Sequence, residues 1–95
     1  MGQVHTIHGA WSSLANGWAS ETLCLSGDTW LEVTLPSKGR IVIEKSEGPS
    51  GPWPKVFVSP WVGPAMRLRL YGATEERYVR IYLSENPKTI QYVNI

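Results

Sequence analysis

The chain has 95 residues, a formal net charge of +1, 42% hydrophobic residues and 18% charged residues. This length suits one small β domain, residues 1–95, and excludes a second domain. The composition is that of a chain that folds rather than of a disordered one. The weak net charge gives no electrostatic reason to expect binding to nucleic acid or to an acidic membrane.

The single cysteine and the first residues narrow the class of protein further. Cys24 is the only cysteine, so an intrachain disulfide and a cysteine-rich metal site are excluded. The N-terminal residues lack the basic start and apolar run of a signal peptide, and no stretch has the ~18 consecutive apolar residues of a membrane span. We therefore expect synthesis in a cytoplasm. This does not fix where the protein acts, because phage virion proteins also lack such signals.

Turn-forming residues recur at intervals of about ten residues, the spacing typical of an all-β sandwich or barrel. We expect a first strand at residues 4–8. Residues 10–20 fit two alternatives, a single helical turn that ends at Gly17 or a loop that carries tryptophan.

Three further strands are expected in the first half of the chain. Those at residues 21–26 and 29–35 are joined by a tight Gly-Asp turn at residues 27–28. The next turn has proline early and glycine late, which favours a hairpin return into a strand at residues 40–45. In the strand at 29–35, alternation points Leu31, Val33 and Leu35 inward and Trp30, Glu32 and Thr34 outward.

The middle of the chain is rich in proline, which is concentrated at residues 47–54 and 59–64. Because proline cannot donate to a sheet ladder, the strand between them, at residues 55–59, is short or lies at an edge. Its alternation is apolar on both faces, with Trp53, Phe57 and Trp61 on one and Val56 and Val58 on the other. We expect one of these faces to be covered by another chain.

The last third carries the clearest pattern. Residues 65–72 and 76–85 alternate apolar and polar residues on either side of a Gly-containing turn, which predicts the two strands of a hairpin. A turn at residues 85–88 then leads into a terminal strand at residues 89–95. In the hairpin, the core-facing residues are Met66, Leu68, Leu70, Val79, Ile81 and Leu83. The opposite face holds only arginine and tyrosine, namely Arg67, Arg69, Tyr71, Tyr78, Arg80 and Tyr82.

This arginine–tyrosine face admits three interpretations. The tyrosine rings could pack on the arginine stems as internal scaffolding. They could form a protein interface, where both residue types carry binding energy. They could also stack on bases while arginine neutralises phosphate. The weak net charge counts against the third interpretation, and we favour the protein interface.

The sequence offers little catalytic chemistry. His5 and His8 would point to opposite faces of a strand, so they would not bind one metal ion together. No known nucleophile motif surrounds Cys24, which we interpret as a small buried or interfacial residue. No Gly-rich phosphate loop precedes a helix. We therefore predict a protein that is not an enzyme and that carries no cofactor or metal.

Most of the tryptophans lie close to glycine or proline, as expected of loops or strand ends: Trp11, Trp18, Trp53 and Trp61. In β-sandwich carbohydrate-binding modules, loop tryptophans commonly stack on sugar rings. The alternative is that these side chains contact neighbouring subunits or cover the ends of the sandwich. We favour the second alternative, because few acidic or amide side chains are available for sugar hydroxyls.

Together these patterns predict an all-β fold, a small antiparallel β-sandwich or barrel of about seven or eight short strands. The predicted function is that of a non-enzymatic structural module that assembles with copies of itself or with a larger lattice. Its most concrete form is a phage virion decoration (cement) or fibre-type protein, made in the host cytoplasm and located in the virion. Otherwise the protein would be cytoplasmic. The alternative is a carbohydrate-binding module, with a glycan as its partner.

Overall fold

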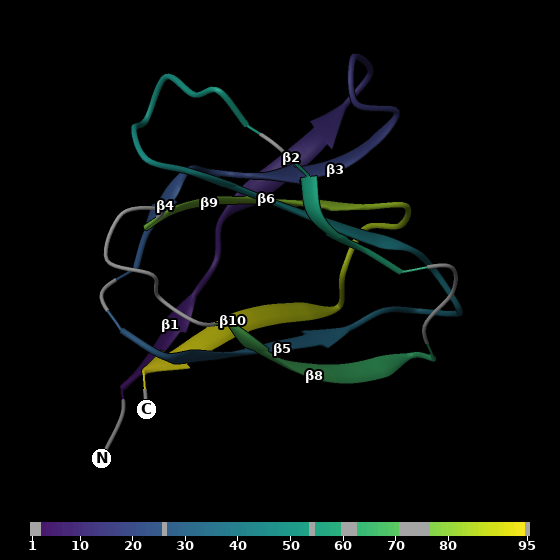
Figure 1. Ribbon diagram of the computed structural model, residues 1–95. Helices are drawn as coiled ribbons and strands as arrows, with labels where there is room; N and C mark the ends of the chain where they lie inside the picture. Colours follow the sequence, from purple (N-terminus) through teal and green to yellow (C-terminus); the bar gives the residue numbers. More distant parts are fainter. Residues whose placement is uncertain (1–2, 26, 54, 60–62, 71–76, 95) are drawn as a thin grey trace.

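The computed structural model describes residues 3–25, 27–53, 55–59, 63–70 and 77–94, and these contain ten short strands in two sheets. The two sheets lie over each other as layers (Figure 1). The predicted all-β fold class is confirmed. The strands outnumber the prediction of about seven or eight, chiefly because residues 10–20 contribute to a hairpin instead of a helical turn or a loop. Within the described ranges, no helix has the length and apolar character needed to cross a membrane.

All strand pairs are antiparallel. In spatial order, sheet A consists of β1 (Val4–Thr6), β10 (Thr89–Asn94), β5 (Thr29–Thr34) and β8 (Ala65–Leu70). Sheet B consists of β2 (Gly9–Ser12), β3 (Gly17–Ser20), β9 (Tyr78–Leu83), β6 (Ile41–Ser46) and β7 (Lys55–Val58). The short strand β4 (Leu23–Cys24) also pairs with β9 in sheet B. The predicted strand at residues 55–59 therefore exists and lies at an edge.

One hydrophobic core fills the space between the inner faces of the two sheets. Because the side chains of a strand alternate between two faces, most strands give every second residue to this core. Its buried members are Ile7, Trp18, Leu23, Leu25, Leu31, Val33, Leu35, Ile41, Ile43, Leu70, Val79, Ile81, Leu83 and Ile90. Met66, Leu68 and Tyr92 pack against them and are partly buried. The predicted inward and outward faces of β5, β8 and β9 are confirmed.

The predicted pairing of consecutive strands is wrong in three places. The expected hairpin of residues 65–72 and 76–85 does not form, because β8 pairs with β5 in sheet A and β9 pairs with β6 in sheet B. Likewise, neither β4 nor β6 pairs with β5, since both belong to sheet B. Each of these three pairs of consecutive strands is divided between the two sheets, and the inward face of each strand is preserved.

The N-terminal segment also crosses between the sheets, at one edge of the sandwich (Figure 1). β1 pairs with β10 in sheet A, and β2 pairs with β3 in sheet B. Between them the buried Ile7 donates its backbone N–H to the carbonyl of Ile90 at 3.1 Å. The predicted first strand at residues 4–8 is shorter than expected and ends at Thr6, and the backbone leaves sheet A after Ile7.

The β2–β3 hairpin ends in a turn whose conformation is held locally. Asn16 has a φ of 52°, a left-handed conformation that asparagine tolerates better than most residues. The side-chain oxygen of Ser12 accepts a hydrogen bond from the backbone N–H of Ala15 at 3.3 Å. This turn presents Leu14 to solvent with 99% of its surface exposed.

Candidate interaction surface

The predicted arginine–tyrosine face is divided between the two outer faces of the sandwich. Arg67 and Arg69 point outward from β8 in sheet A, whereas Tyr78, Arg80 and Tyr82 point outward from β9 in sheet B. The two groups separate because β8 and β9 belong to different sheets. The remaining member of the predicted face, Tyr71, lies outside the described residues.

The outer face of sheet A forms a polar network around one indole ring. The guanidinium carbons of Arg67 and Arg69 lie 4.2 Å and 5.9 Å from the centre of the Trp30 ring. Arg67 pairs with Glu32 at 3.3 Å, and Arg69 pairs with Asp28 at 2.9 Å. The Arg67 and Glu32 side chains keep 56% and 34% of their surface in solvent. Such exposed pairs contribute about 1 kcal/mol or less, so this network adds little to the stability of the fold.

The outer face of sheet B instead carries an apolar row that crosses the sheet from one edge to the other. Register pairs align Ala10 with Ala19, Ala19 with Tyr82, Tyr82 with Val42, and Val42 with Val58. Directly opposed residues of antiparallel strands lie on the same face, so these five side chains form one line. We call this line the apolar row. All five are at least partly exposed, and Val58 keeps 56% of its surface in solvent.

Beside the apolar row, Arg80 occupies a more enclosed position than the arginines of sheet A. Its guanidinium carbon lies 3.9 Å from the centre of a Trp53 ring and 5.9 Å from that of Tyr82. It pairs with Glu44 at 3.2 Å, and the two side chains are 31% and 14% exposed. Within the described residues, no acceptor reaches its buried Nε. Because charges removed from water need partners, Glu44 and the Trp53 ring stabilise the partly enclosed charge of Arg80.

Tyr82 links the apolar row to this charged cluster. Burial raises the pKa of its hydroxyl above the ordinary value of 10.0, and the charge of Glu44 and a hydrogen bond to that carboxylate act in the same direction. The positive charge of Arg80 opposes them by lowering the pKa. The hydroxyl is therefore a neutral donor at physiological pH.

A groove of about 690 Å³ lies over the apolar row and is bounded by the β2–β3 turn. Its lining includes three members of the apolar row, Ala19, Tyr82 and Val42. The fully exposed Leu14 also borders it. Two charged residues of opposite sign, Glu21 and Arg80, also line it, together with three hydroxyl side chains and one alanine, namely Ser12, Ser20, Thr22 and Ala15. The groove thus combines apolar residues of sheet B, a projecting leucine, hydroxyl groups and one charge of each sign.

The edge strand β7 carries exposed apolar side chains, as the sequence predicts. Phe57 is opposite Ile43 and Val58 is opposite Val42, so these two side chains point to different faces, and both are exposed. The expected alignment of Trp53 with Phe57 is wrong. β7 begins only at Lys55, and Trp53 instead stacks on Arg80 over the outer face of sheet B. Trp61, the third member of that predicted contact, lies outside the described residues.

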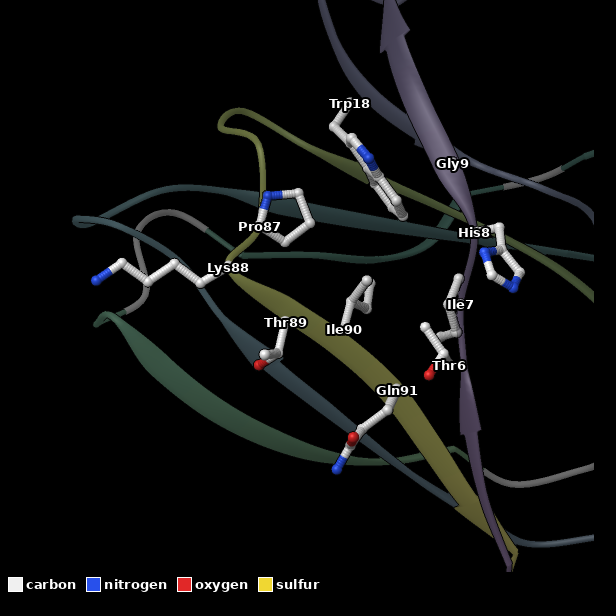
Figure 2. A pocket seen from close by; sticks show the side chains of 10 residues that line it. All are labelled: Thr6, Ile7, His8, Gly9, Trp18, Pro87, Lys88, Thr89, Ile90 and Gln91. Carbon is white, nitrogen blue, oxygen red and sulfur yellow. The ribbon is translucent and has the colours of Figure 1, made fainter.

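The other tryptophans divide between surface and core. Trp11 keeps 52% of its surface in solvent, at the edge strand β2. Trp18 lies near the start of β3, as the prediction of a loop or strand end allows, and it is buried in the core, so it contacts neither a sugar nor a neighbouring subunit. Figure 2 shows Trp18 beside a pocket of about 330 Å³ where the chain crosses between the sheets, with Ile7 and Ile90 below it. A Cβ at Gly9 would clash with the indole of Trp18 and with the backbone carbonyl of Ala19, so only glycine allows this packing.

The candidate chemical residues are scattered. His5 stacks on Tyr92 with 4.7 Å between ring centres, whereas His8 is exposed. Cys24 is exposed in β4 rather than buried. In the part of the chain that the structure describes, no three His, Cys, Asp or Glu residues gather into a group that could hold a metal ion.

Comparisons with protein-family models, with curated proteins and with solved structures gave no match to this chain. Sequence reasoning missed the groove, whose members come from four strands, the β2–β3 turn and the segment between β3 and β4. The available signal was Leu14, a large apolar residue within a short polar segment that ends in Asn16-Gly17.

Proposed function

We propose that this chain is a non-enzymatic module that assembles with copies of itself or within a larger protein lattice. The observation that carries the proposal is the outer face of sheet B, where an apolar row and a groove lie beside a leucine with 99% exposure. Single exposed apolar residues are ordinary on protein surfaces, whereas a contiguous apolar region marks a contact site.

The edge strand of the same sheet supports the proposal. β7 is the last strand of sheet B in the described part of the chain, and it exposes Phe57 and Val58. Edge strands with exposed apolar residues promote contact between chains unless something blocks or covers them. Val58 also belongs to the apolar row, so the edge and the groove form one continuous surface.

A virion decoration or fibre-type protein remains the most concrete form of this proposal. It is supported by the small size of the domain and by the contact face that the apolar row, the groove and the edge strand β7 form together. Partner proteins would then be copies of this chain or a capsid protein. The virion would be its location.

The first test is the mass of the chain in solution, by light scattering after size exclusion. At about 100 µM, an interface with a Kd below about 10 µM is largely occupied. We expect a species of at least twice the 10.6 kDa of one chain. A single 10.6 kDa species at this concentration would contradict self-assembly.

The carbohydrate-binding alternative has one observation in its favour, the half-exposed indole of Trp11. Trp18 is buried and Trp53 is stacked on Arg80, so neither offers a free ring to a sugar. Titration with a panel of oligosaccharides, followed by tryptophan fluorescence, distinguishes the two functions. We expect no saturable change. A saturable change that Trp11→Ala abolishes, together with a monomeric mass, would favour the sugar binder.

A further inference from the structure

The β2–β3 turn and the groove form a matched pair on one molecule. Local hydrogen bonding and the left-handed Asn16 hold the turn that displays Leu14. The floor of the neighbouring groove is formed in part by Ala19, Val42 and Tyr82. A projecting apolar side chain and an apolar groove are the two halves of one contact, and here a single chain carries both.

Such a surface can bind a second copy of itself around a two-fold axis. In a two-fold interface both copies use the same patch. If a residue of the first copy contacts a site on the second, the same residue of the second copy contacts the same site on the first. Leu14 of each copy would then cover the groove of the other. Two exposed leucines and two apolar rows would be removed from water in one step.

The charges in the groove favour a second copy as its occupant. Glu21 and Arg80 line the same groove and have opposite signs. A two-fold rotation about an axis between them exchanges their positions, so each Glu21 carboxylate faces the Arg80 guanidinium of the other copy. That guanidinium already pairs with Glu44 at 3.2 Å, and its five N–H donors allow a second carboxylate. A groove lined by charges of one sign would repel its own copy, whereas this one complements itself.

From this geometry we infer that two copies of the chain associate through the outer face of sheet B, each inserting Leu14 into the groove of the other. This inference rests on the proposed self-assembly and names the surface that carries it out.

The main experiment uses two single variants and a mixture of them. Leu14→Lys charges the projecting side chain, and Val42→Glu charges the groove floor. Each variant alone should weaken association at least about tenfold, the loss typical of a central contact residue. In an equimolar mixture, the lysine of one variant meets the glutamate of the other, and the second contact stays native. We therefore expect the mixture to recover a two-chain species, measured by sedimentation equilibrium.

Val4→Lys is the matched control, because Val4 is 60% exposed and lies on β1 of sheet A. It should leave association unchanged. Circular dichroism melts of all three variants show whether each remains folded. If the parent is an oligomer and both groove variants stay oligomeric, the inferred surface is wrong while self-assembly stands. If the folded variants are monomeric but their mixture stays monomeric too, the contact between Leu14 and the groove is refuted. A monomeric parent contradicts this inference and the self-assembly form of the proposed function.

A second measurement addresses the two charge pairs. Glu21 accepts a hydrogen bond from the backbone N–H of His8 at 3.1 Å, and Glu21→Gln keeps an acceptor for it while removing the charge. We expect association to weaken about 2- to 30-fold, as for the loss of two exposed ion pairs, and to depend less on salt than in the parent. An unchanged salt dependence would show that Glu21 does not face a cation in the assembly.

Discussion

On the outer face of sheet A, the indole of Trp30 lies beneath Arg67, and on the outer face of sheet B, an indole ring of Trp53 lies against Arg80. Both arginines also pair with a glutamate across neighbouring strands. The Arg67–Glu32 side chains are 56% and 34% exposed, whereas the Arg80–Glu44 side chains are 31% and 14% exposed. The same residue types thus form a solvated network on one face and an enclosed cluster on the other.

The surroundings of the two clusters differ. On sheet A, the row that contains Arg67 is polar and includes Glu32, Gln91 and Thr6, and the amide of Gln91 donates to Glu32 at 2.8 Å. The adjacent row of sheet A, formed by Val4, Val93 and Trp30, is apolar, but two guanidinium groups lie over its indole ring. On sheet B, the row adjacent to Arg80 is the apolar row, and the groove and the exposed Leu14 lie beside it. Burying this face against another chain removes apolar surface from water and is favourable.

The largest expected effect comes from Ile81→Asp, which tests which side of β9 faces outward. Ile81 has no exposed surface, and the variant would bury an unpaired carboxylate. We expect a loss of several kcal/mol in the free energy of unfolding, enough to unfold a marginally stable domain. Val4→Asp, at an exposed site, should change it by about 0.5 kcal/mol or less. Chemical denaturation measures both. A parent-like melt for Ile81→Asp would mean that β9 is turned by one residue and that Arg80 and Tyr82 face the core.

The second prediction compares the stability that the Arg80 cluster and the Arg67 cluster each contribute. Arg80→Ala removes the partner of the nearly buried Glu44 carboxylate and the stacking on Trp53, so we expect a cost of about 1–3 kcal/mol in the free energy of unfolding. Arg67→Ala breaks an exposed pair and should cost about 0.5–1 kcal/mol. Urea denaturation of the two variants gives the difference. Equal costs would show that the outer face of sheet B is as solvated as that of sheet A.

The smallest effect concerns the pH dependence of Tyr82. Its pKa is raised in the folded state, so the hydroxyl stabilises the fold below its unfolded pKa, and this contribution is lost as pH rises through the folded pKa. Stability of the parent should therefore fall more steeply than that of Tyr82→Phe above about pH 10. Thermal melts from about pH 8 to about pH 11 compare the two proteins. Parallel curves would indicate that Glu44 and burial do not act on this hydroxyl.

The candidate site was predictable from sequence only in part. Arg80 and Tyr82 stand out because arginine and tyrosine alternate along β9. Leu14, Ala19 and Val42 do not, because each belongs to a different segment and joins the groove only through the register of sheet B. The sequence predicts Arg69 and Arg80 on one face of a single hairpin. The fold places them on opposite outer faces, because β8 and β9 belong to different sheets.

The sequence by itself determined the fold class and which side chains of β5, β8 and β9 point inward. Both follow from local alternation, because side chains of a strand alternate with a period of two whatever the strand pairs with. Only the tertiary structure decided which strands are partners. Each sheet of a sandwich has an inner and an outer face, so a strand that turns back within its sheet and one that crosses to the opposite sheet show the same pattern. That choice depends on packing between residues far apart in sequence, and it placed the apolar row and Leu14 on one surface.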